Sequence, residues 1–288
     1  MLEQTLYLLD VDFVRTALMA AALLGIVSGV MAPLIVLRQM SFSVHGTSEL
    51  ALMGASAALL LGLNVGLGAV VGSIVAAIIL ALLGMSQQDS AVGVVMSFGM
   101  GLSVLFIHLY PGKSSTAFSL LTGQIVGVSG ASLGLLAVIV AVVVGAVALL
   151  WRPLLFASAD PAMAAAAGIN VRLIAILFAV LVGLTTAQSV QIVGALLVMA
   201  LLITPGAAAV QITSSPITAV AWSILFAEVA AVGGLLLSLA PGLPVSVFVT
   251  TISFAIYLIC RLIGWRRGKV VVARENRNAH CCGHAHTD

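Results

Sequence analysis

The sequence predicts an all-α protein, a polytopic bundle of eight or nine transmembrane helices. Hydrophobic residues make up 62% of the 288 residues, whereas only 7% carry a formal charge. Soluble domains carry roughly 25% charged residues because their surfaces face water. A chain with so few charges cannot cover a water-facing surface of its own size. A soluble enzyme, a nucleic-acid-binding protein and a disordered chain are therefore excluded.

Apolar segments long enough to cross a membrane recur along the chain. A helix needs about 20 apolar residues to cross a hydrocarbon core roughly 30 Å thick, and its backbone must be hydrogen-bonded internally. This template predicts nine spans, at about residues 13–37, 46–64, 65–84, 90–110, 130–151, 172–193, 194–212, 217–239 and 244–264. The apolar runs continue through the boundaries near 64/65 and 193/194, so eight spans is the alternative.

Two segments between the spans are expected not to cross. Residues 111–129 are moderately polar and predict a surface loop or a re-entrant piece. In residues 153–171, Asp160 and Pro161 precede an Ala-rich stretch that ends at Gly168. Asp at the N-cap, Pro at the first helical position and Gly at the end are typical of a short helix. We expect this helix to lie parallel to the membrane surface.

The basic residues predict the orientation. Residues 1–264 hold six of the eleven Lys and Arg residues, and the last 24 residues hold the other five. Because cytoplasmic ends and loops attract Lys and Arg, the tail is predicted to lie inside. Arg38 and the 153–171 loop then also lie inside, Lys113 is an exception outside, and with nine spans the N-terminus is outside. The chain divides into a transmembrane domain, 1–264, and a cytoplasmic basic and His/Cys-rich tail, 265–288.

One pair of ionisable residues falls at the start of the second span. His45 and Glu49 are four residues apart, which places them on one helical face about one turn apart. An ionisable residue at membrane depth costs about 2.5–3.5 kcal/mol on insertion scales and usually serves a pathway. One imidazole and one carboxylate form half of a site for a divalent transition ion, which two chains would complete. The alternative is a His–Glu hydrogen bond that only stabilises the bundle.

Two further ionisable residues lie in predicted spans. Glu228 is flanked by apolar residues. We expect it to line a path, to pair with another polar group or to face a partner chain. A structural or gating role is favoured over metal ligation. His108 lies at the outer end of its span. A solvated side chain is the simplest interpretation there, and a metal-entry contact is the alternative.

The tail ends in a run of soft and borderline metal donors: His280, Cys281, Cys282, His284 and His286. Tracts rich in His and Cys bind zinc, copper or nickel. Their spacing does not match a closed structural zinc site, so a regulatory site of moderate affinity is predicted. The alternative is that these tail residues are incidental to transport.

No enzyme active site and no permanently bound cofactor are predicted. Residues 112–114 resemble the end of a nucleotide-binding Walker A loop, but position 107, where that motif requires its first glycine, is Ile107. Nucleotide binding by this chain is therefore rejected.

Several motifs resemble those of the permeases of metal-ion ABC transporters, the membrane subunits of zinc and manganese uptake systems. The family pattern after the first span is Arg-Arg-Met-Ser, then Gly-Asp, three residues and His, then Gly five residues further on. The matching residues here are Arg38, Met40, Ser41 and Gly54. Asp89 corresponds to an Asp that often opens the fourth span. Further matches lie at 158–161, 193–209, 232–234 and 241–246, and the resemblance covers about residues 10–264.

The metal-binding pair departs from this pattern by an exchange. The family has Asp where this chain has His45, and His where this chain has Glu49. The donor set of one imidazole and one carboxylate is kept, so a metal path survives the exchange, whereas the choice of ion is less firmly defined.

The resemblance implies an ABC importer permease in the cell membrane that carries a divalent transition-metal ion while a separate chain hydrolyses ATP. It implies a homodimer around a central path, a cytoplasmic ATPase that docks on the 153–171 helix, and an extracytoplasmic metal-binding protein. Asp160, which caps that helix, and Pro161 are the residues expected to couple it to the ATPase. His45 and Glu49 would bind the ion transiently, and Glu228 and Asp89 are path or gating candidates. Zinc is the expected cargo because the donors of the tail suit it. The alternatives are manganese, or a secondary transporter or channel without an ATPase.

Overall fold

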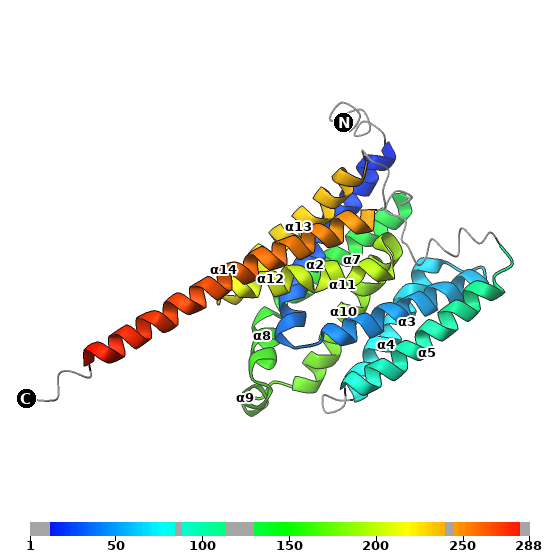
Figure 1. Ribbon diagram of the computed structural model, residues 1–288. Coiled ribbons are helices and arrows are strands. Elements are labelled where there is room, and N and C mark those ends of the chain that lie inside the picture. Colours follow the sequence, from blue (N-terminus) through cyan, green and yellow to red (C-terminus); the bar gives the residue numbers. More distant parts are fainter. Residues whose placement is uncertain (1–11, 84–87, 113–129, 240–244, 283–288) are drawn as a thin grey trace, which may run out of the picture.

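The computed structural model describes residues 12–83, 88–112, 130–239 and 245–282, and every regular element in this part of the chain is a helix (Figure 1). The predicted all-α class is therefore confirmed. The helices are α2 (Asp12–Leu37), α3 (Ser41–Leu60), α4 (Val65–Leu83), α5 (Gln88–Leu109), α7 (Gly130–Leu149), α8 (Trp151–Ala159), α9 (Pro161–Ala166), α10 (Val171–Val193), α11 (Ala195–Leu202), α12 (Thr204–Ile212), α13 (Pro216–Leu239) and α14 (Val245–Cys282).

The helix boundaries follow the predicted spans closely. Six of the described helices are long and apolar enough to cross a membrane: α2, α5, α7, α10, α13 and the first part of α14. The other three predicted spans correspond to α3, which carries several polar residues, and to α4 and the α11–α12 pair, whose apolar stretches are shorter. The estimate of eight or nine spans fits this architecture.

Glycines with positive φ mark the two boundaries that the apolar pattern left weak. Gly62, in the turn after α3, has φ 68°, and Gly194, which ends α10, has φ 85°. Glycine adopts this left-handed backbone without steric cost. The division of both apolar runs is thus confirmed.

The predicted span at 194–212 is wrong as a single helix. It is broken at Ile203 into α11 and α12, with Pro205 in the first turn of α12. Proline has no N–H to donate to the carbonyl one turn earlier, so it cannot continue the first helix. Gly206 lets the start of α12 lie against α2, since a Cβ there would be 2.6 Å from the nitrogen of Pro33.

The 153–171 segment contains the predicted short helix and a second one. Asp160 is the N-cap of α9, where its Oδ1 accepts a hydrogen bond from the Met163 N–H at 2.9 Å. Gly168, with φ 83°, follows the helix and donates to the carbonyl of Ala165, while Ile169 donates to that of Ala164. This paired closure is a Schellman motif. Helix α8, which precedes α9, was not predicted.

Helix α3 crosses α4 with the two backbones in contact. A Cβ on Gly54 would meet the carbonyl oxygen of Gly68 and would lie 3.0 Å from the Cα of Gly72. A Cβ on Gly72 would in turn meet the carbonyl oxygen of Leu50. This close approach of the two backbones fixes α3 against α4.

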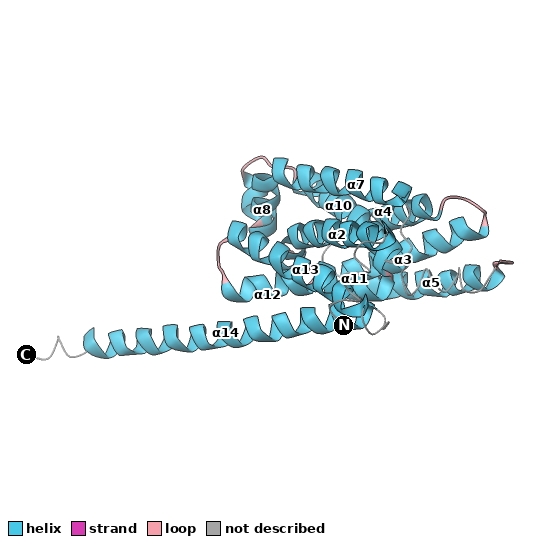
Figure 2. Cartoon of the chain, turned by 90° about the horizontal axis from the view of Figure 1, so that it is seen from above, coloured by secondary structure: helices cyan, strands magenta, loops and turns pink. Residues whose placement is uncertain are grey.

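Helix α14 extends well beyond the bundle in both views (Figures 1 and 2). The predicted span ended at residue 264, whereas the helix continues through the basic residues to Cys282.

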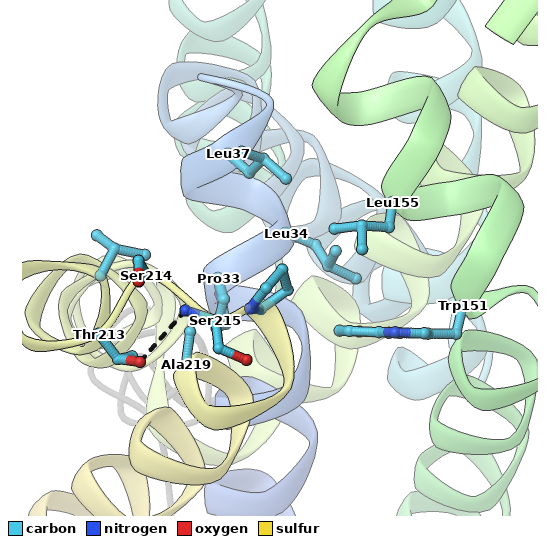
Figure 3. Close-up of a pocket in the computed structure, with 11 residues that line it drawn as sticks. Pro33, Leu34, Leu37, Trp151, Leu155, Thr213, Ser214, Ser215 and Ala219 are labelled. Carbon is cyan, nitrogen blue, oxygen red and sulfur yellow. Dashed lines mark hydrogen bonds between the residues drawn. The ribbon is translucent and has the colours of Figure 1, made fainter.

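Three parts that were predicted to lie inside are on one side of the bundle. Arg38, which follows α2, donates a hydrogen bond to Ser158 of α8. A Cβ on Gly264 of α14 would lie 2.8 Å from the carbonyl oxygen of Gln211, near the end of α12. A cavity of about 180 Å³ lies where α2, α8 and the α12–α13 turn meet (Figure 3). The shared side of Arg38 and the 153–171 segment is confirmed.

Candidate metal-binding site on helix α3

Helices α4 and α5 pack closely against the part of α3 that carries His45 and Glu49. A Cβ on Gly46 would lie 2.9 Å from Val92 Cγ1 of α5 and 3.6 Å from Leu80 Cδ1 of α4. Further along, a Cβ on Gly99 of α5 would lie 3.7 Å from the carbonyl oxygen of Glu49. The backbone around the candidate pair is therefore held on two sides.

The two side chains lie on one face of α3, about one helical turn apart. Glu49 is 6% exposed and His45 is half-buried. The Nδ1 atom of His45 is buried and has no hydrogen-bond partner within the described residues. Buried polar atoms are nearly always hydrogen-bonded, so an unpartnered one needs an explanation. An imidazole nitrogen and a carboxylate oxygen on one face can both coordinate a divalent transition ion.

Within the described residues the pair remains a half-site. No group of three or more His, Cys, Asp or Glu side chains that could hold a metal ion is found there. Further ligands for an ion at His45 and Glu49 would have to come from water, from another chain or from side chains outside the described part, such as that of Asp89.

A buried polar stretch on α10 was missed in the sequence. Helix α10 packs against α3 and α4. Four polar residues within little more than one turn of α10 are each at most 1% exposed: Thr185, Thr186, Gln188 and Ser189. The Nε2 atom of Gln188 has no partner within the described residues. The run TTAQSVQ inside an otherwise apolar span was the available signal.

Glu228 lies in a different interface, between α13 and α2. A Cβ on Gly25 of α2 would lie 2.6 Å from Glu228 Oε1, and that oxygen is buried without a hydrogen-bond partner in the described part of the chain. Glu228 does not join His45 and Glu49, because no three-residue donor group is found among the described side chains.

The remaining candidates lie away from the pair or outside the described part. His108 is exposed in the last turn of α5, nine residues beyond Gly99, which is about 13 Å along a helix. Asp89 lies in the first turn of α5, and its side chain is outside the described part, as are the side chains of His280, Cys281 and Cys282. His284, His286 and residues 113–129 are outside it altogether.

Relatives of the chain share its length and its fold. The chain is 32% identical over 259 residues to the "Manganese transport system membrane protein MntC" of Listeria monocytogenes, covering 87% of this chain and 92% of that protein. It is 27% identical over 225 residues to the "High-affinity zinc uptake system membrane protein ZnuB" of Haemophilus influenzae, covering 77% and 86%. The solved structure of "PsaBC from Streptococcus pneumoniae in complex with Fab" superposes with a TM-score of 0.82 at 27% identity, over 90% of this chain and 95% of that one.

The family resemblance seen in the motifs is confirmed. The family model described as the ABC 3 transport family matches residues 10–264, which includes all of the described helices up to the first part of α14. The multi-pass helical architecture agrees with that of the relatives. The chain therefore belongs to the ABC 3 transport family.

Proposed function

We propose that this chain is the membrane permease of an ATP-driven importer for a divalent transition-metal ion, and that His45 and Glu49 bind the ion in transit. The observation that carries the proposal is the buried Nδ1 atom of His45, which has no hydrogen-bond partner within the described residues, on the same helical face as the buried Glu49, in a chain of the ABC 3 transport family. Two ligands per chain bind an ion weakly enough for release, which transport requires.

The cargo that we propose is manganese or zinc. The relatives at 32% identity are named for manganese, and a relative at 27% identity is named for zinc, so the comparisons do not favour the zinc expectation. Imidazole suits zinc and carboxylate suits manganese, which makes this mixed pair compatible with both. The zinc expectation rested on the tail, whose donor side chains lie outside the described part of the chain.

We propose three partners for the chain, and the placement of the α8–α9 segment supports the first of them, the ATPase. The ATPase that the family resemblance implies would dock on α9. This helix is exposed except at Ala164 and lies on the same side as Arg38 and the end of α12. This side would be cytoplasmic, together with the end of α14. A second copy of the chain would complete the ion's ligands, and an extracytoplasmic metal-binding protein would deliver it.

Uptake into proteoliposomes tests this function. The permease, reconstituted with a partner ATPase and a metal-binding protein, should accumulate radiolabelled manganese or zinc only when ATP is present. Accumulation that needs no ATPase and follows an ion gradient would instead identify a secondary transporter or a channel. Competition between the two labelled ions ranks them as cargo.

Removing the N-cap of α9 should weaken coupling to the ATPase. Replacing Asp160 by Ala removes the hydrogen bond to Met163, and loss of such a cap costs about 0.5–2 kcal/mol, which is large for a helix of six residues. We expect a severalfold fall in ATP-driven uptake with unchanged metal binding, and Asp160→Asn should restore uptake because Asn also caps. Asn170→Ala, which removes a matched cap from α10, is the control. Equal uptake in all of these variants would contradict the coupling role.

Glu228 is proposed as a gating residue and not as a ligand. Glu228→Gln keeps the shape of the side chain against Gly25 and removes its charge. Metal affinity measured by titration calorimetry should be unchanged, while the uptake rate should change severalfold, within the range of typical coupling energies of about 1–3 kcal/mol. Glu49→Gln is the contrasting variant, because it should lose metal binding. Loss of binding in Glu228→Gln would instead make Glu228 a ligand.

A further inference from the structure

Arg38 joins three helices that are far apart in the sequence. Its Nε donates to Ser158 Oγ at 2.6 Å, and its Nη2 donates to the carbonyl oxygen of Leu154 at 3.4 Å, both on α8. The guanidinium carbon lies 4.3 Å from the centre of the ring of Phe178 on α10. Ser158 also donates to the carbonyl of Leu154. The side chain thus holds the end of α2 against both α8 and α10.

The contacts of Arg38 depend on the planar shape of its side chain. Burial lowers the pKa of Arg38 to about 10, so the group is still charged at neutral pH. The three groups around it, a hydroxyl, a peptide carbonyl and an aromatic face, are all neutral. Only a planar guanidinium can donate sideways to Ser158 and Leu154 and also lie over the ring of Phe178, so lysine cannot replace it.

A rigid turn connects Arg38 to the helix that carries the candidate metal ligands. Arg38 caps the end of α2; Gln39 then donates to the carbonyl of Val36 and Met40 to that of Ile35, which is a Schellman closure. Gln39 has φ 54° and is the one residue other than glycine with positive φ in the described part of the chain. The left-handed backbone conformation costs a residue other than glycine roughly 1–2 kcal/mol, and it is kept only where the surrounding structure requires it. Helix α3 begins directly after this turn, and His45 lies seven residues after Arg38. A displacement of Arg38 would therefore displace the start of α3.

The other side of α8 has room for movement. The cavity of about 180 Å³ separates Trp151 and Leu155 of α8 from the α12–α13 turn, and Leu34 and Leu37 of α2 also line it (Figure 3). Protein interiors are otherwise close-packed and transmit strain. A shift of α8 into this space would meet little resistance from α12 and α13, whereas Arg38 would follow α8 through its two hydrogen bonds.

We propose that Arg38 is a positioning residue that transmits movement of the α8–α9 segment to α3 and so links the ATPase to the metal-binding pair. The inference rests on the proposed function. Arg38 does not touch the ion; it sets the position of the helix start from which His45 and Glu49 project. The ring of Phe178 on α10, which the guanidinium covers, orients the group toward α8.

The ratio of metal transported to ATP hydrolysed tests this role in the full reconstituted transporter. Arg38→Lys and Ser158→Ala should each retain metal binding and basal ATP hydrolysis. The ratio should fall about tenfold in Arg38→Lys, within the usual range of coupling between sites, and less in Ser158→Ala, which removes a single contact. Arg172→Lys, an exposed arginine on the same side, is the matched control and should keep the wild-type ratio.

The outcomes separate this inference from the proposed function. An unchanged ratio in Arg38→Lys beside an active wild type overturns the role of Arg38 alone. Lost metal binding in Arg38→Lys with an unchanged thermal unfolding midpoint also overturns it, because the residue would then act at the site itself. If Arg38→Lys unfolds, the ratio in Ser158→Ala decides, and a wild-type value there overturns the inference. Absence of ATP-driven uptake by the wild type overturns the proposed function and this inference together.

Discussion

Replacing His45 or Glu49 by Ala is expected to abolish ATP-driven metal uptake while the chain still inserts and assembles with its partners. Each change removes one of the two donors on the face of α3, and a half-site with one ligand cannot hold the ion long enough to pass it on. Fold and packing should survive, because His45 is only half-buried and its Nδ1 makes no hydrogen bond within the described residues. Uptake of labelled manganese and zinc is the measurement.

Exchanging the two residues is a sharper test than removing them. The double variant His45→Asp with Glu49→His keeps one imidazole and one carboxylate a helical turn apart, and it should retain uptake. His45→Asp alone places two carboxylates in a buried site, where like charges disfavour each other, and it should lose most uptake. Normal uptake in either alanine variant would remove the pair from the path, as would loss of uptake in the double exchange with assembly intact.

Replacing Gly68 by Val should prevent α3 from reaching its native position. Gly68 faces the carbonyl oxygen of Gly54 across the α3–α4 crossing, and a Cβ there would also meet the Cβ of Ala58. Overpacking usually costs about 1–3 kcal/mol, and a backbone carbonyl cannot rotate away as a side chain can. We expect a lower thermal unfolding midpoint in detergent and the loss of metal binding.

The matched control for Gly68 is a glycine without neighbours. Gly145 of α7 has nothing within 4 Å of a placed Cβ, so Gly145→Val should unfold close to the wild-type midpoint. Wild-type stability in Gly68→Val would show that the two backbones do not touch as the structure has them.

The elements that could be predicted from sequence are those with local signals. The span boundaries follow from apolar length, and the α9 cap follows from Asp160, Pro161 and Gly168, which act on neighbouring backbone groups. The division at Gly194 left a visible glycine, although the apolar run continued through it. The break before Pro205 could also have been predicted, since proline rarely continues a helix, and it was missed because the segment has the length of one span.

The contacts that could not be predicted join distant parts of the chain. Arg38 and Ser158 are 120 residues apart, and a single sequence contains no signal that pairs them. The orientation of Glu228 toward Gly25 also depends on how α13 is rotated against α2, which nearly uniform apolar composition does not specify. In the candidate site, the helical spacing placed His45 and Glu49 on one face, whereas the absence of a partner for Nδ1 among the described residues became evident only from the packed structure.

Anomalous diffraction from crystals of the complete transporter grown with manganese or zinc would test the central claim most directly. The account predicts a metal peak roughly 2.0–2.2 Å from a ring nitrogen of His45 and from a carboxylate oxygen of Glu49. A metal peak elsewhere in the membrane domain, with both side chains turned toward lipid, would contradict it.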